Sequence, residues 1–160
     1  MSAFQAVSGA RHGRPLTLAQ QVKHSTTRAS HPRPLTEKER SFTRWLIEHA
    51  KCGEEEKKKY LSQLEAATVV RMCECGCASI DFAIAGIASE QFAPLHPFGD
   101  FIAKDRRFGV FVFSKREDLA GVEIYPLGSV EASREFPDPS ELVPAEWKEA
   151  NQSAQTTSGS

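Results

Sequence analysis

The 160-residue sequence predicts an α+β domain in which two N-terminal helices pack on an antiparallel sheet of about five strands. The first observation is that two consecutive segments have apolar residues at spacings of three and four, the helical period. The second is that later apolar segments alternate with period two, as the residues of strands do. The third is that short turns join these later segments, which predicts hairpins and therefore antiparallel pairing.

The first helix is expected over residues 37–51 and the second over residues 54–65. Thr36 and Glu39 match the capping box, in which the threonine oxygen accepts from a free backbone N–H and the glutamate reaches back to the cap. Gly53 is expected to terminate the first helix. Apolar residues at helical spacing form the faces that we expect to be buried: Phe42, Trp45, Leu46, Tyr60, Leu61 and Leu64.

Five segments are expected to form strands: residues 68–74, 77–85, 98–104, 107–115 and 120–127. The first two are expected to join in a tight hairpin at Gly76, because glycine adopts a positive φ without strain. Residues 86–97 are expected to be a loop, since Pro94 and Pro97 limit regular pairing. Residues 108–113 are apolar on both faces and predict a central, doubly covered strand. Two helices cover only one face, so the other is expected to meet a loop, a tail or a second copy of the chain.

A single body is expected over residues 35–143, between a disordered basic arm at 1–34 and a mostly disordered tail at 144–160. The arm has five basic residues and no acidic one, so weak contact through the arm is the only nucleic-acid binding that we expect. No apolar run reaches the roughly 18 residues that span a bilayer, and we expect no membrane partner. Three cysteines too close together for an ordinary disulfide framework favour the cytoplasm.

The cysteines Cys73, Cys75 and Cys77 alternate with other residues. Zinc thiolates usually come as two Cys-x-x-Cys pairs, and here only Cys52 remains to supply a fourth sulfur. A turn between the two strands is expected to splay the three side chains, so buried structural thiols are the first interpretation. Zinc or another soft metal is one alternative. Thiol redox chemistry is another, in which the charge of Arg71 would favour a thiolate at Cys73.

Polar residues that alternate with apolar ones on the central strands are candidates for binding a small polar ligand: Arg71, Asp81, Glu123 and Tyr125. The other interpretation of such alternation is the polar side of an amphipathic sheet. His96 followed by Asp100 is an acid–base candidate in the predicted loop. The chain has no nucleophile elbow, no phosphate-binding glycine loop and no His-Glu-x-x-His motif, which counts against the common enzyme classes.

The segment from Gln63 to Asp81 contains, in order, Gln-Leu-Glu, Val-Val, Arg-x-Cys-x-Cys-Gly-Cys and Ser-Ile-Asp. In this pattern the chain resembles a group of small, uncharacterised bacterial proteins. The resemblance continues through residues 109–113, 119–125 and 137–139 and covers roughly residues 37–142. It implies a compact bacterial α+β domain and no particular activity.

The sequence therefore favours a non-enzymatic binding or interaction module that needs no cofactor. Its expected partner is an unidentified protein, or a second copy of the chain bound through the second sheet face. The alternative function is a zinc or thiol-redox site built on the hairpin of Cys73, Cys75 and Cys77.

Overall fold

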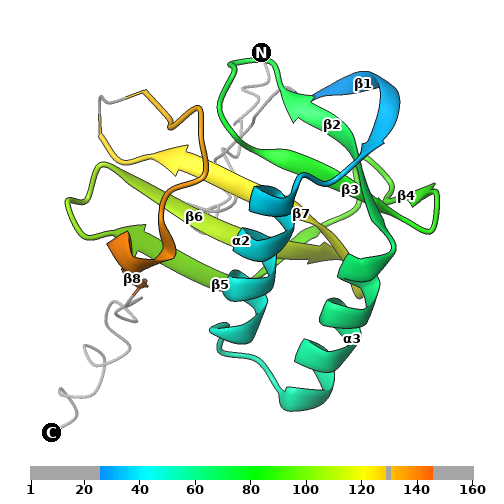
Figure 1. Ribbon diagram of the computed structural model, residues 1–160, viewed down its shortest axis with the longest axis horizontal. Coiled ribbons are helices and arrows are strands. Elements are labelled where there is room, and N and C mark those ends of the chain that lie inside the picture. The colour runs from blue at the N-terminus through cyan, green and yellow to red at the C-terminus, as the bar shows by residue number, and fades with distance from the viewer. Residues whose placement is uncertain (1–25, 129–130, 146–160) are drawn as a thin grey trace, which may run out of the picture.

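The computed structural model describes residues 26–128 and 131–145, where a pair of helices lies side by side on a single antiparallel sheet (Figure 1). This arrangement confirms the predicted α+β class. The sheet has eight strands, so the prediction of about five was wrong. The elements, in chain order, are β1 Thr26–Pro34, α2 Glu37–Glu48, α3 Glu54–Glu65, β2 Ala67–Cys73, β3 Ile80–Ile84, β4 Ile87–Ala88, β5 Leu95–Ala103, β6 Phe108–Lys115, β7 Asp118–Pro126, the 3₁₀ helix η1 Pro139–Glu141 and β8 Leu142–Pro144.

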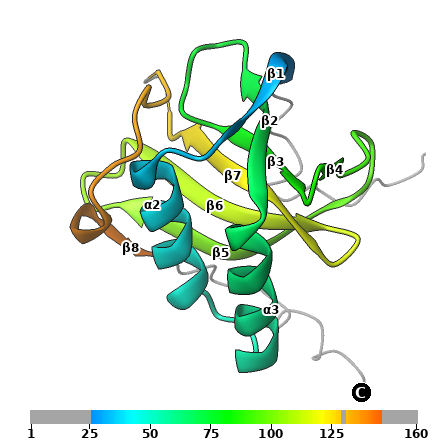
Figure 2. The same ribbon diagram turned by 45° about the vertical axis from the view of Figure 1, so that its right-hand side comes forward.

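Three strands that the sequence did not predict account for the larger sheet. β1 lies within the predicted arm, β4 within the predicted loop, and β8 at the C-terminal limit of the predicted body. The sheet order is β1-β2-β3-β7-β6-β5-β8, with β4 paired to β3 beside this path, so all three lie at edges (Figure 2). Edge strands bury few side chains and therefore need no apolar alternation. Residues 1–25 of the predicted arm and 146–160 of the predicted tail lie outside the described residues.

β1 is attached to the N-terminus of α2 by an ion pair between Arg33 and Glu39. The two terminal guanidinium nitrogens of Arg33 donate to the two carboxylate oxygens at 2.8 and 2.7 Å. The same carboxylate accepts the N–H of Thr36 at 2.7 Å, and Thr36 Oγ1 accepts the N–H of Glu39 at 3.2 Å, which confirms the predicted capping box. Burial acts to raise the pKa of the Glu39 carboxyl, but the hydrogen bonds from Arg33 and Thr36 outweigh burial and hold this pKa below its ordinary value.

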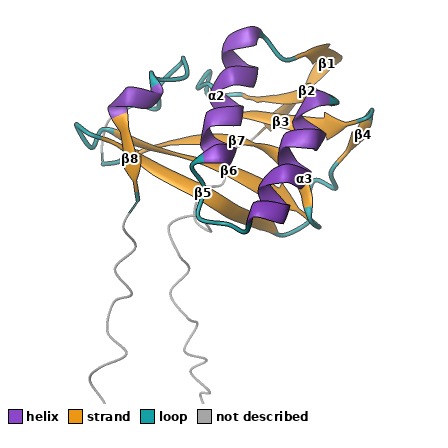
Figure 3. Cartoon of the chain, turned by 60° about the horizontal axis from the view of Figure 1, so that its bottom comes forward, coloured by secondary structure: helices purple, strands orange, loops and turns teal. Residues whose placement is uncertain are grey.

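Both helices cover the same face of the sheet (Figure 3). α3 has the predicted limits, whereas α2 ends at Glu48 rather than at residue 51. Gly53 does not terminate α2: it is the N-cap of α3, with an extended backbone and its N–H donated to the Glu56 carboxylate at 3.2 Å. The predicted buried faces are confirmed except at Trp45 and Leu61, which are only partly buried.

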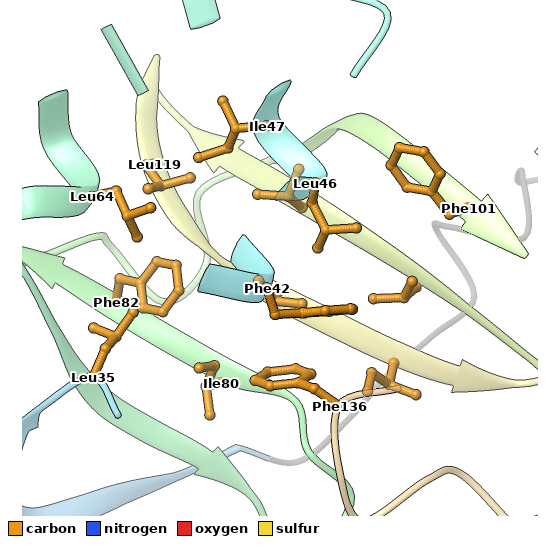
Figure 4. Close-up of a cluster of buried hydrophobic side chains, with 14 of the residues drawn as sticks. Leu35, Phe42, Leu46, Ile47, Leu64, Ile80, Phe82, Phe101, Leu119 and Phe136 are labelled. Carbon is orange, nitrogen blue, oxygen red and sulfur yellow. The ribbon is translucent and has the colours of Figure 1, made fainter. Parts of the chain in front are cut away.

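The main hydrophobic core lies between the helices and the sheet (Figure 4). It contains Phe42 and Leu46 of α2, Leu64 of α3 and Phe82 of β3. Phe136, from the segment after β7, stacks on Phe42 with ring centroids 4.7 Å apart. Full burial of a side chain of this size contributes roughly 1.5–3 kcal/mol, so this core fixes the helices to the sheet and draws the C-terminal segment over its edge.

β6 is the central strand that the sequence predicted, and all of its residues are buried. Phe111 and Phe113 lie on the face away from the helices and are 1% and 2% exposed. They form a second apolar cluster with Ala120 and Tyr125. Because this face is buried within one chain, its aromatic residues do not require a second copy of the protein. Self-association through it stays a prediction.

β5 begins at Leu95, inside the segment predicted to be a loop. Pro97 pairs with Phe113 of β6, and the register then shifts, so that Gly99 pairs with Val112. The shift leaves Phe98 outside the ladder, and proline is tolerated next to such an irregularity. β5 therefore continues through Pro97, although this proline had predicted a loop.

Replacement of Glu39 by glutamine removes the charge and keeps the size of the side chain. It is expected to lower the free energy of unfolding at neutral pH by about 1 kcal/mol, because solvent screens a partly exposed pair. The stabilisation from a carboxyl with a lowered folded-state pKa is fully present above the unfolded-state pKa of about 4.3 and is lost as the pH falls through the folded-state pKa. Urea unfolding of both proteins between about pH 7 and pH 3 should show the difference shrinking, and a constant difference would contradict this role.

At Gly121 of β7, an added Cβ would lie 2.4 Å from the carbonyl oxygen of Ile80 on β3. The carbonyl group of Ile80 belongs to the backbone and cannot rotate away from the new methyl group as a side chain could. Gly121→Ala should therefore push the two strands apart and lower the free energy of unfolding by about 2–4 kcal/mol. Gly53→Ala is the matched control, because its Cβ would meet only Glu56 Oε2, at 3.7 Å. The control should cost about 1 kcal/mol or less. Equal costs in thermal or urea unfolding would argue against a close approach at Gly121.

Candidate metal centre

The cysteine turn, residues 73–79, connects β2 to β3. β2 ends at Cys73, one residue earlier than predicted but with the predicted length, and β3 begins at Ile80 and is shorter than predicted. The connection is therefore longer than the predicted tight hairpin. Gly76 has a φ of 79°, and its N–H donates to the carbonyl oxygen of Cys73 at 3.1 Å. The predicted glycine turn is confirmed, and its positive φ is a conformation that other residues adopt only with strain.

The sulfur atoms of the turn converge. The Sγ atoms of Cys73, Cys75 and Cys77 all lie within 4.8 Å of one another. Cys73 Sγ and Cys75 Sγ are 2.8 Å apart, and the N–H of Cys77 donates to Cys75 Sγ at 3.4 Å. The expectation that a turn would splay the three side chains was wrong. The positive φ at Gly76 reverses the chain, so Cys77 returns toward Cys73 instead of continuing along a strand.

Two contacts hold the cysteine turn against the rest of the fold. Ser79 Oγ accepts the N–H of Ile124 on β7 at 2.9 Å and donates to the carbonyl oxygen of the same residue at 3.3 Å. Cys77 Sγ lies 3.3 Å from this hydroxyl. The N–H of Ala78 donates to the carbonyl oxygen of Ser133 at 2.9 Å. The turn is therefore fixed by β7 and by the segment that follows β7.

The thiols differ in exposure, since Cys73 and Cys77 are buried and Cys75 is exposed. Burial disfavours the thiolate and raises the pKa of the Cys73 thiol to about 12. Burial also raises the pKa of the Cys77 thiol. In the absence of a metal ion these two thiols are therefore neutral at physiological pH. A metal ion reverses this preference, because a coordinating thiol is deprotonated outright.

The spacing of the three sulfurs fits a soft cation. With Zn–S bonds of about 2.3 Å in tetrahedral geometry, two ligand sulfurs lie about 3.8 Å apart. The sulfurs of the cysteine turn lie within 4.8 Å of one another and the closest two are 2.8 Å apart, so shifts of about 1 Å would bring them to that separation. Thiolates select zinc and copper(I) over hard cations such as calcium. The donor set therefore suits a thiophilic ion.

The fourth sulfur considered from the sequence is not part of this cluster. Cys52 lies between α2 and α3, and among the described residues the metal-ligating group consists of the three cysteines of the turn. The four-cysteine version of the zinc interpretation is therefore wrong. A tetrahedral ion on this turn would take its fourth ligand from outside the cluster.

The redox alternative required a positive charge beside a thiol. Arg71 instead donates from Nε to Asp81 Oδ2 at 2.9 Å and from Nη2 to the carbonyl oxygen of Ser89 at 3.3 Å. Its charge is balanced by this carboxylate, and the pKa of Cys73 is raised by burial rather than lowered. Reactive cysteines are exposed thiolates with lowered pKa values, so this geometry counts against a nucleophilic Cys73.

The four predicted ligand-binding residues lie on one sheet face in two groups. Arg71 of β2 pairs with Asp81 of β3, and Asp81 pairs with Gly121 of β7. Glu123 and Tyr125 follow Gly121 at alternate positions of β7 and therefore lie on the same face. Arg71 and Asp81 form the ion pair described above. The Tyr125 hydroxyl donates to Asp100 at 3.1 Å, and burial followed by the charge of Asp100 raises the pKa of this phenol. Glu123, 7% exposed, lies between the groups.

The predicted acid–base pair is not formed as such, because Asp100 accepts from Tyr125 while the side chain of His96 is exposed. Sequence reasoning also missed Lys115, the last residue of β6, which is only 8% exposed. A single lysine at the end of an apolar strand is typical of a solvated position. No sequence pattern therefore marked its burial.

Comparison of the chain with known protein families, curated proteins and solved structures gives no match. The resemblance to small bacterial proteins described above therefore stays a prediction. Neither helix among the described residues is long and apolar enough to cross a membrane.

The three thiols of the turn should differ in reactivity. Brief treatment of the metal-free native protein with iodoacetamide at about pH 7 is expected to label Cys75 at least about tenfold faster than Cys73 and Cys77, because burial hides these two and keeps them protonated. Mass spectrometry of the digested protein measures the ratio, and protein unfolded in urea provides the equal-reactivity control. Faster labelling of Cys73 would instead support the thiol-redox interpretation.

Proposed function

We propose that this protein is a non-enzymatic binding module that holds a soft metal ion, zinc in the first instance, on Cys73, Cys75 and Cys77. The observation that carries the proposal is the convergence of three Sγ atoms within 4.8 Å on one short turn. The sequence alone ranked this function second, because the side chains were expected to diverge. Their convergence reverses that order.

The rigidity of the cysteine turn supports the proposal. Metal affinity is highest where the ligands are positioned before the ion arrives, since less ordering is then required on binding. Gly76 fixes the turn, and Ser79 ties it to the backbone of β7. The N–H of Cys77 already donates to Cys75 Sγ, a contact that favours the thiolate form required of a ligand.

Three protein thiolates leave one position of a tetrahedral zinc ion open. Water or a side chain of a partner protein would complete the shell, which keeps the predicted interaction role within the same site. Two pairs lie on the sheet face near the turn and across it, Arg71 with Asp81 on β2 and β3 and Tyr125 with Asp100 on β7 and β5, and the groups of each pair bind each other. This favours a binding function over a catalytic one. A reducing compartment such as the cytoplasm would keep the thiols available to the metal.

A metal-free interaction module is the second candidate. The observation that favours it is the burial of Cys73 and Cys77, at 7% and 5% exposure, where a free cysteine packs as a small apolar side chain. In that case the turn is a structural device and the partner, a protein or a second copy, binds elsewhere.

Protein purified without chelator is expected to contain about one zinc ion per chain, measured by elemental analysis and by competition with a chromogenic chelator. The double variant Cys73→Ser/Cys77→Ser should lose the metal, and Cys75→Ser, at an exposed position, should bind it at least about tenfold more weakly. Cys52→Ser is the control and should retain it. Affinity should rise with pH, because bound thiols release their protons.

Circular dichroism of each variant separates loss of ligand from loss of fold. A folded wild-type protein that is metal-free and does not take up added zinc or copper(I) would overturn the metal proposal and leave the interaction module.

A further inference from the structure

A second candidate site lies at the other end of β3 from the cysteine turn. β3 runs from Ile80, next to the turn, to Ile84, a span of about 13 Å at the usual rise of a strand. Beyond Ile84, the loop that carries β4 folds over the end of β6, and together they line an open pocket of about 390 Å³. This is within the usual size range of sites for small molecules. In Figure 1, β4 lies on the opposite side of the molecule from β8.

One side of this loop pocket is apolar and the other carries a buried cation. Aliphatic side chains, among them Ile84, Ile87 and Ala93, form the apolar wall, and Lys115 of β6 also lines the pocket. Lys115 is only 8% exposed although it is charged. An apolar wall with a single convergent charge is the usual composition of a site for a small amphipathic ligand.

The ammonium group of Lys115 has fewer acceptors than donors. Lysine has three N–H donors, and among the described residues Nζ donates to one backbone oxygen, that of Gln91, at 3.3 Å. Its other contact is with the ring of Phe113, whose centroid lies 6.0 Å away. A buried charge is costly unless it is paired and hydrogen-bonded, so this position favours an anion as a further partner.

Asp81 is the acidic group that acts on Lys115, but it is already engaged. Its Oδ2 accepts from Arg71 Nε at 2.9 Å. Arg71, Asp81 and Lys115 together have a net charge of +1. Burial lowers the pKa of Lys115; the charge of Asp81 raises it and the charge of Arg71 lowers it further. The buried group therefore has one positive charge in excess.

The remaining charges that line the loop pocket have partners of their own. Arg116 forms an ion pair with Glu90 at 2.7 Å, so their charges cancel. Asp118 accepts from the side-chain amide of Gln63 at 2.7 Å. Gln63 is neutral, so Asp118 keeps its negative charge. Among the described residues, Lys115 is thus the lining cation that a carboxylate would meet without displacing an ion pair.

We propose that the loop pocket binds a small carboxylate with a short aliphatic chain, whose oxygens accept from Lys115 and whose chain lies along Ile84 and Ile87. One ammonium, opposite Asp118 in the β6–β7 ladder, matches a monoanion better than a phosphate dianion, because the negative charge of Asp118 repels a second charge on the ligand. The apolar wall matches a short hydrocarbon chain. This site shares no residue with the cysteine turn and does not depend on metal binding.

Butyrate, hexanoate, acetate and inorganic phosphate serve as probes in titrations of the full chain followed by two-dimensional amide NMR. Hexanoate is expected to bind saturably, at least about threefold more tightly than acetate, because its chain buries more apolar surface. Shifts should concentrate on residues 84–93 and 115–118. Hexylamine, which has the same chain and the opposite charge, should not compete.

Lys115→Met should weaken hexanoate binding at least about tenfold, since it removes the charged donor and keeps the length of the side chain. Lys104→Met, which removes an exposed lysine from another part of the surface, is the matched control and should bind as the wild type does. Ile87→Glu offers a second variant that spares the core, because Ile87 is 77% exposed. It places an acid beside the ligand and should also weaken binding.

The proposal is overturned if no carboxylate binds at about 10 mM, if Lys104→Met and Lys115→Met weaken binding equally, or if phosphate binds more tightly than hexanoate. The Cys73→Ser/Cys77→Ser protein should still bind hexanoate, so failure of the metal proposal and failure of this one are distinguishable.

Discussion

The pairing of β3 with β7 joins the two halves of the sheet, and the rest of the structure depends on it. β1, β2 and β3 lie on one side of this joint, and β7, β6, β5 and β8 on the other. The ladder itself has only two register pairs. It is extended by Ser79, whose hydroxyl binds both backbone groups of Ile124, and it requires Gly121 because no Cβ fits against Ile80. The short ladder is thus extended by the side chain of Ser79, and the close approach of its strands depends on the missing side chain of Gly121.

Both candidate sites are attached to this joint and share a physical feature. Each buries groups that a ligand could bind: the neutral thiols of Cys73 and Cys77, and the ammonium of Lys115, which has one backbone acceptor among the described residues. Burial of the ammonium costs free energy that an apolar core must offset, whereas a neutral thiol packs as a small apolar side chain. The helices supply that core on one face, and the aromatic residues of β6 supply a smaller one on the other. The sites lie where the apolar packing ends.

The sequence predicted those elements of the fold whose structure is determined by neighbouring residues. The capping box at Thr36 and the limits of α3 follow from neighbouring residues, and the apolar run around Phe111 could belong only to a central strand. β1 could not be predicted, because an edge strand containing Pro32 needs no alternation and is held by a contact between Arg33 and a helix.

The candidate sites were harder to predict for a related reason. Strand alternation predicts the direction of the Cys73 side chain. The position of Cys77 depends instead on the positive φ of Gly76, which reverses the chain. The burial of Lys115 depends on a loop that folds back from β3, which composition alone does not place. Local rules therefore identified the chemically active residue types, while distant contacts decided their arrangement.

The bond between Ser79 and Ile124 has a consequence for synthesis of the chain. The two residues are 45 positions apart in the sequence, so the hairpin of β2 and β3 leaves the ribosome before its partner strand has been made. At translation rates of about 5–20 residues per second, the interval is about 2–9 s. Throughout it the thiols are neither shielded by β7 nor held in position. The nascent cysteines are therefore open to oxidation and to the wrong metal until β7 has been made, and a reducing environment would matter most during those seconds.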